Sequence, residues 1–438
     1  MKSSLSWAVA TALLGFLLWR NGQTARTILI PTPDFPHGYY AEASHSEHCT
    51  SVKDTPSNGM RYCEDAAFWE RVDSGGTIIG KVLLLSCDPN RKAWNTVMGP
   101  LSDPTPRGAL WFYDIQDIEA RPRQVTLEGY PEGHDFHPLG FDIYPSQPNQ
   151  PHSNLFVVNH ARNSSTIEQF VMSWDTPDRA QWVRTLSGPE LVAPNALALT
   201  SQTSFYLTHD HRFTRRLPGV LGKTLPIIES TLALPLGWAT HVTIPTTSTQ
   251  SESQSATHIT IASRIPFANG IAISPDGAQV AIASTTLCEV LFYSRDINTQ
   301  ALSLHGRVPT PFAPDNIIFD SSGSLIVAGH PHFQALVAVA ANRTAARAPS
   351  WVVSITPTLI GAEAGVNQGQ KEDSSRWDLD APVPASRKVR GVLGYELRTL
   401  YQSDGSAFSA ASTALRDAET GVVYIVGLYE DGLMVCSP

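Results

Sequence analysis

The stretch Ala268-Asn269-Gly270-Ile271-Ala272-Ile273-Ser274-Pro275-Asp276-Gly277 (residues 268–277) and the residues after it indicate how this chain folds. A short apolar run typical of a β-strand ends at the turn 275–277, and two more such runs follow at 279–284 and 288–294. Asp-Gly supplies the positive φ angle that a tight connection requires. The segment therefore predicts three successive antiparallel strands.

The same alternation of strand and turn continues along the chain from about residue 70. Two further examples are 316–319 with 324–329 around the turn 320–323, and 411–415 with 422–428 around the turn 418–421. No stretch between Val72 and the C-terminus has a sustained apolar period of 3.6 residues, which argues against Rossmann and TIM architectures. Repeated antiparallel units of about 60 residues predict an all-β propeller with about six blades.

Composition agrees with this prediction and excludes other classes. Of the 438 residues, 42% are hydrophobic and 16% are charged, with 16 Phe, 12 Tyr and 10 Trp, which argues against a disordered chain or a coiled coil. The net charge of −9 and the absence of long Lys/Arg runs argue against nucleic-acid binding. Two polar stretches, 245–256 and 361–377, are expected to be exposed insertions.

The N-terminus carries a targeting signal. The run from Leu5 to Trp19 is almost entirely apolar, and at 1.5 Å per residue it spans only about 22 Å, less than the bilayer core of about 30 Å. We interpret residues 1–25 as a signal peptide or an uncleaved signal anchor, and residues 45–438 as the propeller. The protein is then secreted, or attached to a membrane or lipid surface through this hydrophobic helix.

Secretion agrees with two other features. In an oxidising compartment the five cysteines can form at most two disulfides and leave one thiol over. Asn163 and Asn342 each begin a glycosylation sequon. No CxxC pair is present, which argues against zinc.

Several carboxylates and amides stand at the starts of apolar runs. They are Glu64-Asp65, Asn195, Asn269 and Asp315-Asn316. In a propeller, equivalent strand starts from different blades converge on the central channel, and such oxygens suit Ca²⁺ better than a transition metal. The alternative for each residue is a turn position, as in Asn269 before Gly270.

Five segments of the sequence resemble the paraoxonase/arylesterase family of calcium-dependent lactonases. They are FHPLGF (136–141), LFVVNH (155–160) with STIE (165–168), FYLTHDH (205–211), FANGIAISPDG (267–277) and DNII (315–318). The resemblance runs from about Cys49 to Cys436, outside the two insertions. It implies a six-bladed propeller with two calcium ions in a central tunnel, and a disulfide between Cys49 and Cys436 that closes the ring.

The resemblance also implies the ligands of both ions. The catalytic calcium would be held by Glu64, Asn195, Asn269, Asp315 and Asn316, all of which are present. The structural calcium would be held by Asp65, the main-chain carbonyl of Phe141 and an Asp after position 195. Ala196 stands at that last position, so the structural site lacks one carboxylate. One calcium ion is expected, and the second stays open.

The candidate catalytic base departs from the family pattern. The family pairs two histidines, whereas this chain keeps His160 and has Leu139 in the place of its partner. His137 is the candidate substitute, because residues i and i+2 of a strand share a face. The resemblance also places His211 and His330 near the tunnel, in contact with substrate or behind the ligands. Their alternative role is that of hydrogen-bonded structural histidines.

These residues predict calcium-dependent hydrolysis of lactones or aryl esters, with a small hydrophobic substrate and a water activated by a histidine. Asp315 could assist in activating that water. The alternative, which Leu139 and Ala196 favour, is a calcium-stabilised propeller that binds a hydrophobic ligand or partner without efficient catalysis. The sequence does not identify the natural substrate or the oligomeric state.

Overall fold

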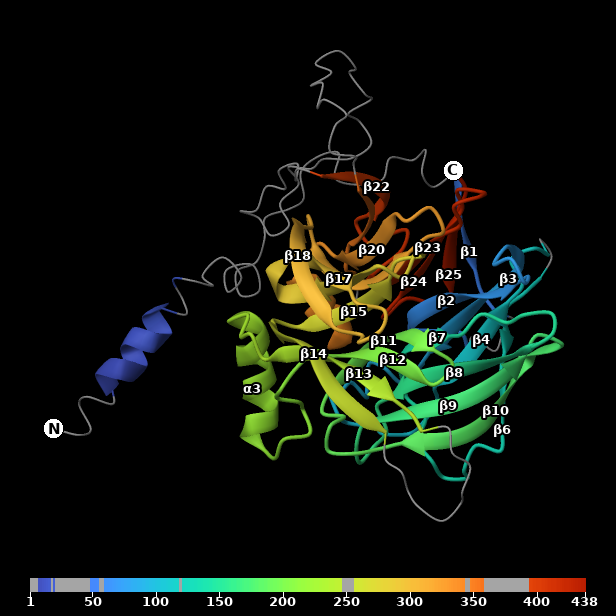
Figure 1. Cartoon of the computed structure of the whole chain (residues 1–438). Coiled ribbons are helices and arrows are strands. Elements are labelled where there is room, and N and C mark those ends of the chain that lie inside the picture. Colours follow the sequence, from blue (N-terminus) through green and yellow to red (C-terminus); the bar gives the residue numbers. More distant parts are fainter. Residues whose placement is uncertain are drawn as a thin grey trace.

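In the computed structural model, six mainly antiparallel sheets radiate from a common axis as the blades of a propeller, which confirms the predicted architecture (Figure 1). The structure describes residues 7–16, 19, 48–54, 59–117, 120–245, 256–342, 347–357 and 394–438. The expected insertions fall almost entirely on residues 246–255 and 358–393, which lie outside the described residues.

Each blade is built from strands that follow one another in sequence, with the innermost strand first. Blade 1 consists of β2 (Cys63–Val72), β3 (Ile78–Cys87), β4 (Ala109–Tyr113) and β5 (Arg123–Gln124). Blade 2 consists of β7 (Pro138–Ile143), β8 (His152–Asn159), β9 (Thr166–Ser173), β10 (Thr176–Leu186) and an added strand, β6 (Thr126–Glu128), parallel to β10. Blade 3 consists of β11 (Pro194–Ser201), β12 (Ser204–His209), β13 (Gly237–Thr243) and β14 (Thr257–Ile265).

The strand-turn units quoted from the sequence belong to the last three blades. Blade 4 consists of β15 (Ala268–Ile273), β16 (Gln279–Ser284), β17 (Glu289–Arg295) and β18 (Leu302–Pro309). Blade 5 consists of β19 (Ala313–Phe319), β20 (Leu325–His330), β21 (Ser350–Pro357) and β22 (Tyr395–Ser403). Blade 6 consists of β23 (Ala411–Arg416), β24 (Val423–Gly427), β25 (Leu433–Cys436) and β1 (Cys49–Val52).

Blade 6 takes strands from both ends of the chain. β1 pairs antiparallel with β25, and Cys49 lies opposite Cys436 and forms the ring-closing disulfide that the resemblance implies (Figure 1). A second disulfide, Cys63–Cys87, joins β2 to β3 within blade 1. The sequence allowed two disulfides but did not pair these two cysteines.

Adjacent blades pack face to face through hydrophobic clusters. In β3, Val82 and Leu84 contact blade 2, while Leu83 and Leu85 contact blade 6. Successive side chains of a strand point to opposite faces, so a strand between two blades is apolar at nearly every position. This two-sided burial explains the continuous apolar run of β3.

The six inner strands form the wall of the tunnel. Each of β2, β7, β11, β15, β19 and β23 contacts the next around the ring. Gly270 lies where β15 approaches β19, and a Cβ there would stand 2.7 Å from the Asn316 Cα. A larger residue at position 270 would push the two blades apart. Asn269-Gly270 lies within strand β15 and is not a turn.

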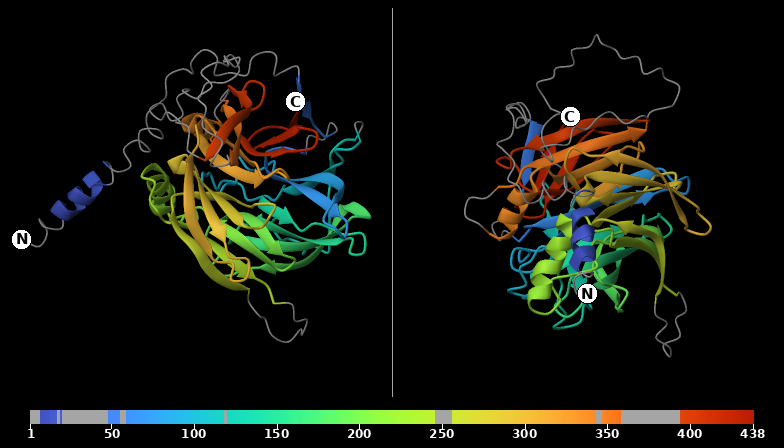
Figure 2. Two further views of the ribbon diagram at one scale, coloured as in Figure 1. Left: turned by 45° about the horizontal axis from the view of Figure 1, so that its top comes forward. Right: turned by 90° about the vertical axis from the view of Figure 1, so that its left-hand side faces the viewer.

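Among the described residues, two α-helices occur that the apolar periodicity did not predict. They are α3 (Val220–Thr231) and α4 (Phe333–Ala340), which lie on the same side of the molecule (Figure 2). Helix α3 was not predicted because it contains Pro226, and proline in the interior of a segment argues against a helix. At the other end of the chain, residues 7–16 are helical. Within the described residues, no helix has the length and apolar content needed to span a membrane.

Candidate active site

A pocket opens at the end of the tunnel where the inner strands begin. Its volume is about 670 Å³, including the space at its open mouth. Polar residues from five blades lie on its walls: Glu64, Asp88, Arg91, Asn95, His137, His160, Asn195, Asp210, Asn269, Thr285, Asp315 and His330. Most of the side chains expected near the catalytic calcium thus lie around one cavity.

The five expected ligands of the catalytic calcium lie within the first four residues of inner strands and are buried. Glu64 lies on β2, Asn195 on β11, Asn269 on β15, and Asp315 and Asn316 on β19. Asn269 Nδ2 donates to Asp315 Oδ1 (2.7 Å) and Asn316 Nδ2 donates to Glu64 Oε1 (3.0 Å). Asn316 differs from the other four, because it faces the cavity at the far end of the tunnel. The amide nitrogens thus turn toward protein acceptors.

The amide oxygens of these asparagines, and one carboxylate oxygen of Glu64, have no hydrogen-bond donor from the protein. Asn195 Oδ1, Asn269 Oδ1, Asn316 Oδ1 and Glu64 Oε2 are buried and accept no hydrogen bond. A buried acceptor without a partner costs about 1–3 kcal/mol, so the three on Glu64, Asn195 and Asn269 around this pocket, with that of Asn316 next to Glu64, fit a site for a bound cation. Among the described residues, no group of three or more His, Cys, Asp or Glu side chains is arranged to hold a metal. The donor set is therefore mainly amide oxygen, which hard cations such as Ca²⁺ accept.

We call the polar end of the pocket, formed by Glu64, Asn195, Asn269 and Asp315, the cup. Its electrostatics also favour a bound cation. Burial raises the pKa of Glu64 well above its usual range, and the nearby carboxylates of Asp65 and Asp315 raise it further. Removing the carboxylates from water and placing them together disfavours their charged forms. A cation in the cup would favour the charged carboxylates and so oppose both the effect of burial and the repulsion between them.

The expected site of the structural calcium, deeper in the tunnel, has different surroundings. Asp65 Oδ2 accepts from Phe141 N (3.0 Å), and Asp65 Oδ1 accepts from Ala66 N (2.8 Å) and lies 3.1 Å from Thr413 Oγ1. Both carboxylate oxygens are thus engaged by the protein, and Ala196 offers no side-chain oxygen. Burial raises the pKa of Asp65 to about 7. The residues present form a hydrogen-bonded brace between β2, β7 and β23 and do not fit a second calcium site.

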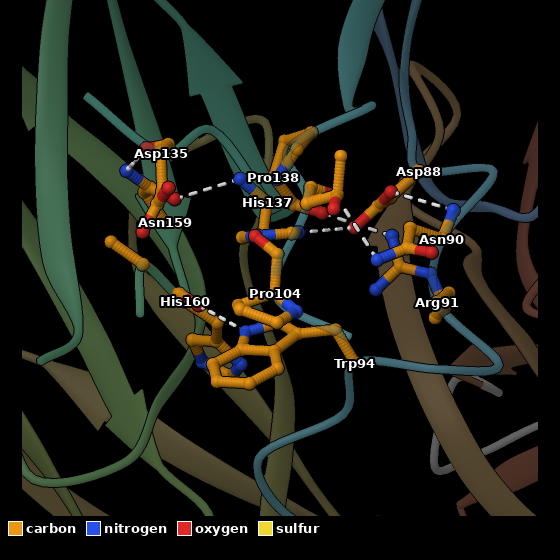
Figure 3. A network of polar contacts seen from close by, with 12 residues as sticks. Asp88, Asn90, Arg91, Trp94, Pro104, Asp135, His137, Pro138, Asn159 and His160 are labelled. Atoms are coloured by element: carbon orange, nitrogen blue, oxygen red, sulfur yellow. Dashed lines mark hydrogen bonds and ion pairs between the residues drawn. The ribbon is translucent and has the colours of Figure 1, made fainter. Parts of the chain in front are cut away.

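His137 lies in the pocket with both ring nitrogens occupied. Its Nδ1 is 2.8 Å from Asp88 Oδ2 and its Nε2 is 3.1 Å from the carbonyl of Pro104 (Figure 3). Both ring nitrogens of His137 therefore have a polar partner from the protein. In this arrangement the ring has no unpaired nitrogen that faces a water.

His160 also has no free nitrogen. Its Nε2 lies 2.8 Å from the carbonyl of Pro194 and therefore donates, so its Nδ1 accepts from the hydroxyl of Thr96 (2.8 Å). Burial lowers the pKa of His160 to about 4. The residue is a neutral imidazole that holds the strand start before Asn195 and the segment around Thr96.

His330 is the pocket histidine with a free lone pair. Its Nε2 lies 2.8 Å from Asp315 Oδ2 and donates to it, while its buried Nδ1 makes no hydrogen bond. His211 is placed elsewhere: its Nε2 lies 2.7 Å from Ser230 Oγ on α3, and its ring packs edge-on against Phe267. Of these two histidines, only His330 lines the pocket.

Apolar side chains cover the cup. They are Trp94, Val97, Met98, Leu139, Phe267, Phe333, Leu336 and Leu428. Arg215 fixes part of this wall, since its Nε and Nη2 donate to the carbonyls of Val97 (3.0 Å) and Met98 (2.8 Å). Leu139 packs in the cluster between blades 2 and 3 as well as lining the pocket. This wall suits a hydrophobic group bound next to the polar cup.

Sequence reasoning missed the contribution of the loop between β3 and β4. Asp88, Arg91, Trp94 and Asn95 from this loop all line the pocket. The only local signal was a charged, Pro- and Asn-containing stretch directly after a buried strand, which is also typical of an exposed turn. The loop folds over the end of the tunnel, and that fold brings these residues to the site.

Comparisons with known proteins give a consistent relationship. The Arylesterase family model matches residues 99–373. Serum paraoxonase/arylesterase 1 of Mus musculus is 27% identical over 233 residues, covering 52% of this chain and 59% of the mouse protein. Serum paraoxonase/arylesterase 2 of Homo sapiens is 25% identical over 234 residues (53% and 60%), and serum paraoxonase/lactonase 3 of Oryctolagus cuniculus is 24% identical over 230 residues (52% and 59%). Each match spans somewhat more than half of the relative's length.

Proposed function

The chain belongs to the arylesterase family, and from that premise we propose that it hydrolyses lactones or aryl esters in the pocket at the start of the inner strands. The observation that carries the proposal is the set of four unpartnered buried oxygens on Glu64, Asn195, Asn269 and Asn316. The names of the relatives, which include arylesterases and a lactonase, support this substrate class.

One calcium ion is the cofactor in this proposal. Glu64, Asn195, Asn269, Asp315 and Asn316 would hold it, and bound there it would supply Lewis acidity toward the substrate carbonyl and the developing oxyanion. Asp65 and Phe141 hold no second ion in this proposal, because Ala196 lacks the carboxylate expected beside them and two backbone amides already donate to Asp65. The surrounding residues position the substrate: the apolar wall binds its hydrophobic part and excludes water.

His330 is the proposed general base. Asp315 accepts the Nε2 proton of His330 and so holds the ring in the tautomer with a free Nδ1 lone pair. A carboxylate that orients a histidine in this way is a common arrangement for taking a proton from water. His137 and His160 are positioning residues in this scheme, since all four of their ring nitrogens are engaged.

The decisive experiment measures turnover of phenyl acetate and of medium-chain γ- and δ-lactones by the full chain, with calcium and after EGTA treatment. Asn269→Ala should abolish most turnover and weaken calcium binding about 10- to 100-fold by calorimetry. Asn298→Ala, an exposed asparagine between β17 and β18, is the matched control. Turnover that is equal with calcium and with EGTA would exclude the calcium mechanism, and no turnover on any substrate would exclude the enzyme.

A second candidate function is binding of a hydrophobic ligand without turnover. The engaged ring nitrogens of His137 and His160 and the apolar Leu139 favour it. A protein that binds calcium and a long-chain ester but leaves that ester intact over hours would support this alternative.

We also assign the protein to the secretory pathway. The two disulfides support this compartment, and Asn163 and Asn342 are both exposed, as glycosylation requires. Attachment to a lipid surface through the N-terminal segment is part of the same proposal. Mass spectrometry of the secreted protein, before and after glycosidase treatment, checks the sequons and the mature N-terminus.

A further inference from the structure

Arg91 is a buried arginine of the pocket that the reaction scheme leaves unused. It follows β3 on the loop that covers the tunnel, and only 4% of its surface is exposed. Its Nε donates to the carbonyl of Tyr62 (3.1 Å) and its Nη2 to the carbonyl of Pro138 (2.9 Å). These two bonds fix the plane of the guanidinium between blades 1 and 2.

The third nitrogen of this guanidinium has no protein partner. Among the described residues, Nη1 makes no hydrogen bond and no carboxylate lies within ion-pair distance of Arg91. Asp88, the nearby acid on the same loop, is already engaged: Oδ2 pairs with His137 and Oδ1 accepts from Asn90 N (2.8 Å). A guanidinium has five N–H donors and stays charged, so a buried one with unused donors is suited to an anionic partner.

The charge of Arg91 acts on Glu64, whose pKa it lowers against the larger effect of burial. Asp88 lies 2.8 Å from His137, and Asp210 lies 3.2 Å from His211. A calcium ion in the cup would compensate Glu64 and Asp315. The positive charge of Arg91 then remains at the pocket wall, next to the apolar side chains that bind the substrate body.

We propose that Arg91 binds a carboxylate carried by the substrate, so that the preferred substrates are esters or lactones with an acidic group on the acyl part. This proposal rests on the proposed function and names the substrate class of the same site. The fixed guanidinium would offer Nη1 to the carboxylate oxygen without any rearrangement of the protein.

A matched pair of substrates tests this selectivity. Phenol release from monophenyl succinate, which is anionic, is compared with release from its methyl ester, which is neutral and of similar shape. The wild type should prefer the anionic ester, and Arg91→Met should reduce the ratio of the two kcat/KM values about 10- to 100-fold. Arg91→Lys should keep part of the preference, because the charge remains and the planar fork is lost. Arg179→Met, an exposed arginine on β10, should leave the ratio unchanged.

Binding measurements separate this proposal from the proposed function. Calorimetry with monomethyl succinate and with dimethyl succinate, on the calcium-loaded protein, needs no turnover. Tighter binding of the anion that is lost in Arg91→Met supports the subsite even if no ester is hydrolysed. Equal binding of both probes by the wild type would overturn the proposal. Anion preference that persists in folded Arg91→Met would also overturn it, because the metal would then be the anion receptor. If Arg91→Met fails to fold, the wild-type and Arg91→Lys ratios decide.

Discussion

At the scale of single residues, the pocket histidines differ in which ring nitrogen is free. His330 keeps one lone pair because Asp315 accepts its other proton, whereas His137 and His160 have partners at both nitrogens. No sequence pattern contains this information, since it depends on a carbonyl from Pro104 and a hydroxyl from Thr96. The resemblance predicted the ligands by position, but the tautomers had to come from the geometry.

His330→Gln should lower kcat for phenyl acetate by about 10²–10⁴, because glutamine cannot accept a proton from water. Calcium binding measured by calorimetry should change little, which separates loss of the base from loss of the metal. The control is His305→Gln, an exposed histidine on β18. Wild-type kcat in His330→Gln would remove this residue from the chemistry.

The fully buried His209 should make the unfolding free energy of the protein fall at acid pH. Burial lowers the pKa of His209 to about 3, its ring stacks on Trp238 with centroids 4.5 Å apart, and neither nitrogen has a partner. The folded state therefore stays neutral while the unfolded state, with a pKa near 6.5, takes up a proton. The contribution of His209 to the unfolding free energy is therefore complete above about pH 6.5 and is lost as the pH falls toward 3.

His209→Phe should keep the stacking and remove this proton uptake. Between pH 7 and pH 5 the variant should lose about 2 kcal/mol less unfolding free energy than the wild type. Urea titrations at the two pH values measure the difference. Parallel losses in both proteins would show that His209 does not titrate on unfolding.

At the scale of elements, the inner strands explain why the position of the expected ligands at the tunnel mouth could be predicted. Strands β2, β11, β15 and β19 each have a polar residue within their first three positions, at the tunnel mouth, and continue with small and apolar residues that pack against the next blade. The sequence pattern records that change of environment, and so it identified Asn195, Asn269 and Asp315. The loop with Arg91 has no such periodic pattern, and its packing over the tunnel was not predictable.

Asp65 joins three of these strands. Asp65→Ala should lower the unfolding free energy by about 2–4 kcal/mol, because the buried amides of Ala66 and Phe141 lose their acceptor. Added calcium should not restore this loss if the brace works without an ion. Asp178→Ala, an exposed aspartate on β10, is the control in the same denaturation series. Recovery of the variant by calcium would mean that an ion does bind at the deeper position.

The two disulfides should contribute unequally to stability. Cys49–Cys436 closes a loop with a sequence separation of 387, and Cys63–Cys87 one of 24. The chain-entropy estimate gives about 6 kcal/mol for the first and about 3.5 kcal/mol for the second. Denaturation of the two double-serine variants should therefore show the larger loss for Cys49→Ser with Cys436→Ser. The reverse order would mean that the loop between β2 and β3 contributes more than ring closure.

At the scale of the whole molecule, calcium should link the blades. The proposed ligands come from blades 1, 3, 4 and 5, so one bound ion stabilises contacts across the tunnel. We expect a stoichiometry of one calcium per chain, and at calcium 100-fold above its Kd a stabilisation of about 2.7 kcal/mol relative to the chelated protein. Metal analysis after dialysis and thermal melts with and without EGTA measure both quantities. Two ions per chain would contradict the brace at Asp65.

The overall architecture was predictable, because turn chemistry and two-sided burial repeat in every blade. The parts that were not predictable have local physical causes. Pro226 masked α3, the parallel strand β6 is only three residues long, and the pairing of Cys63 with Cys87 depends on the register of β2 and β3. Each of these depends on tertiary contacts that a single stretch of sequence does not contain.

The pairing of β1 with β25 also determines when the molecule can be completed during synthesis. Residues 49–52 leave the ribosome among the first of the described sheet, yet their partner strand is the last one made. At about 5–20 residues per second, the N-terminal strand waits at least about 20 s with an open edge. Such an edge can pair with other chains. Nascent chains should therefore need protection by chaperones until residue 436 emerges, and a truncation before β25 would keep this edge open permanently.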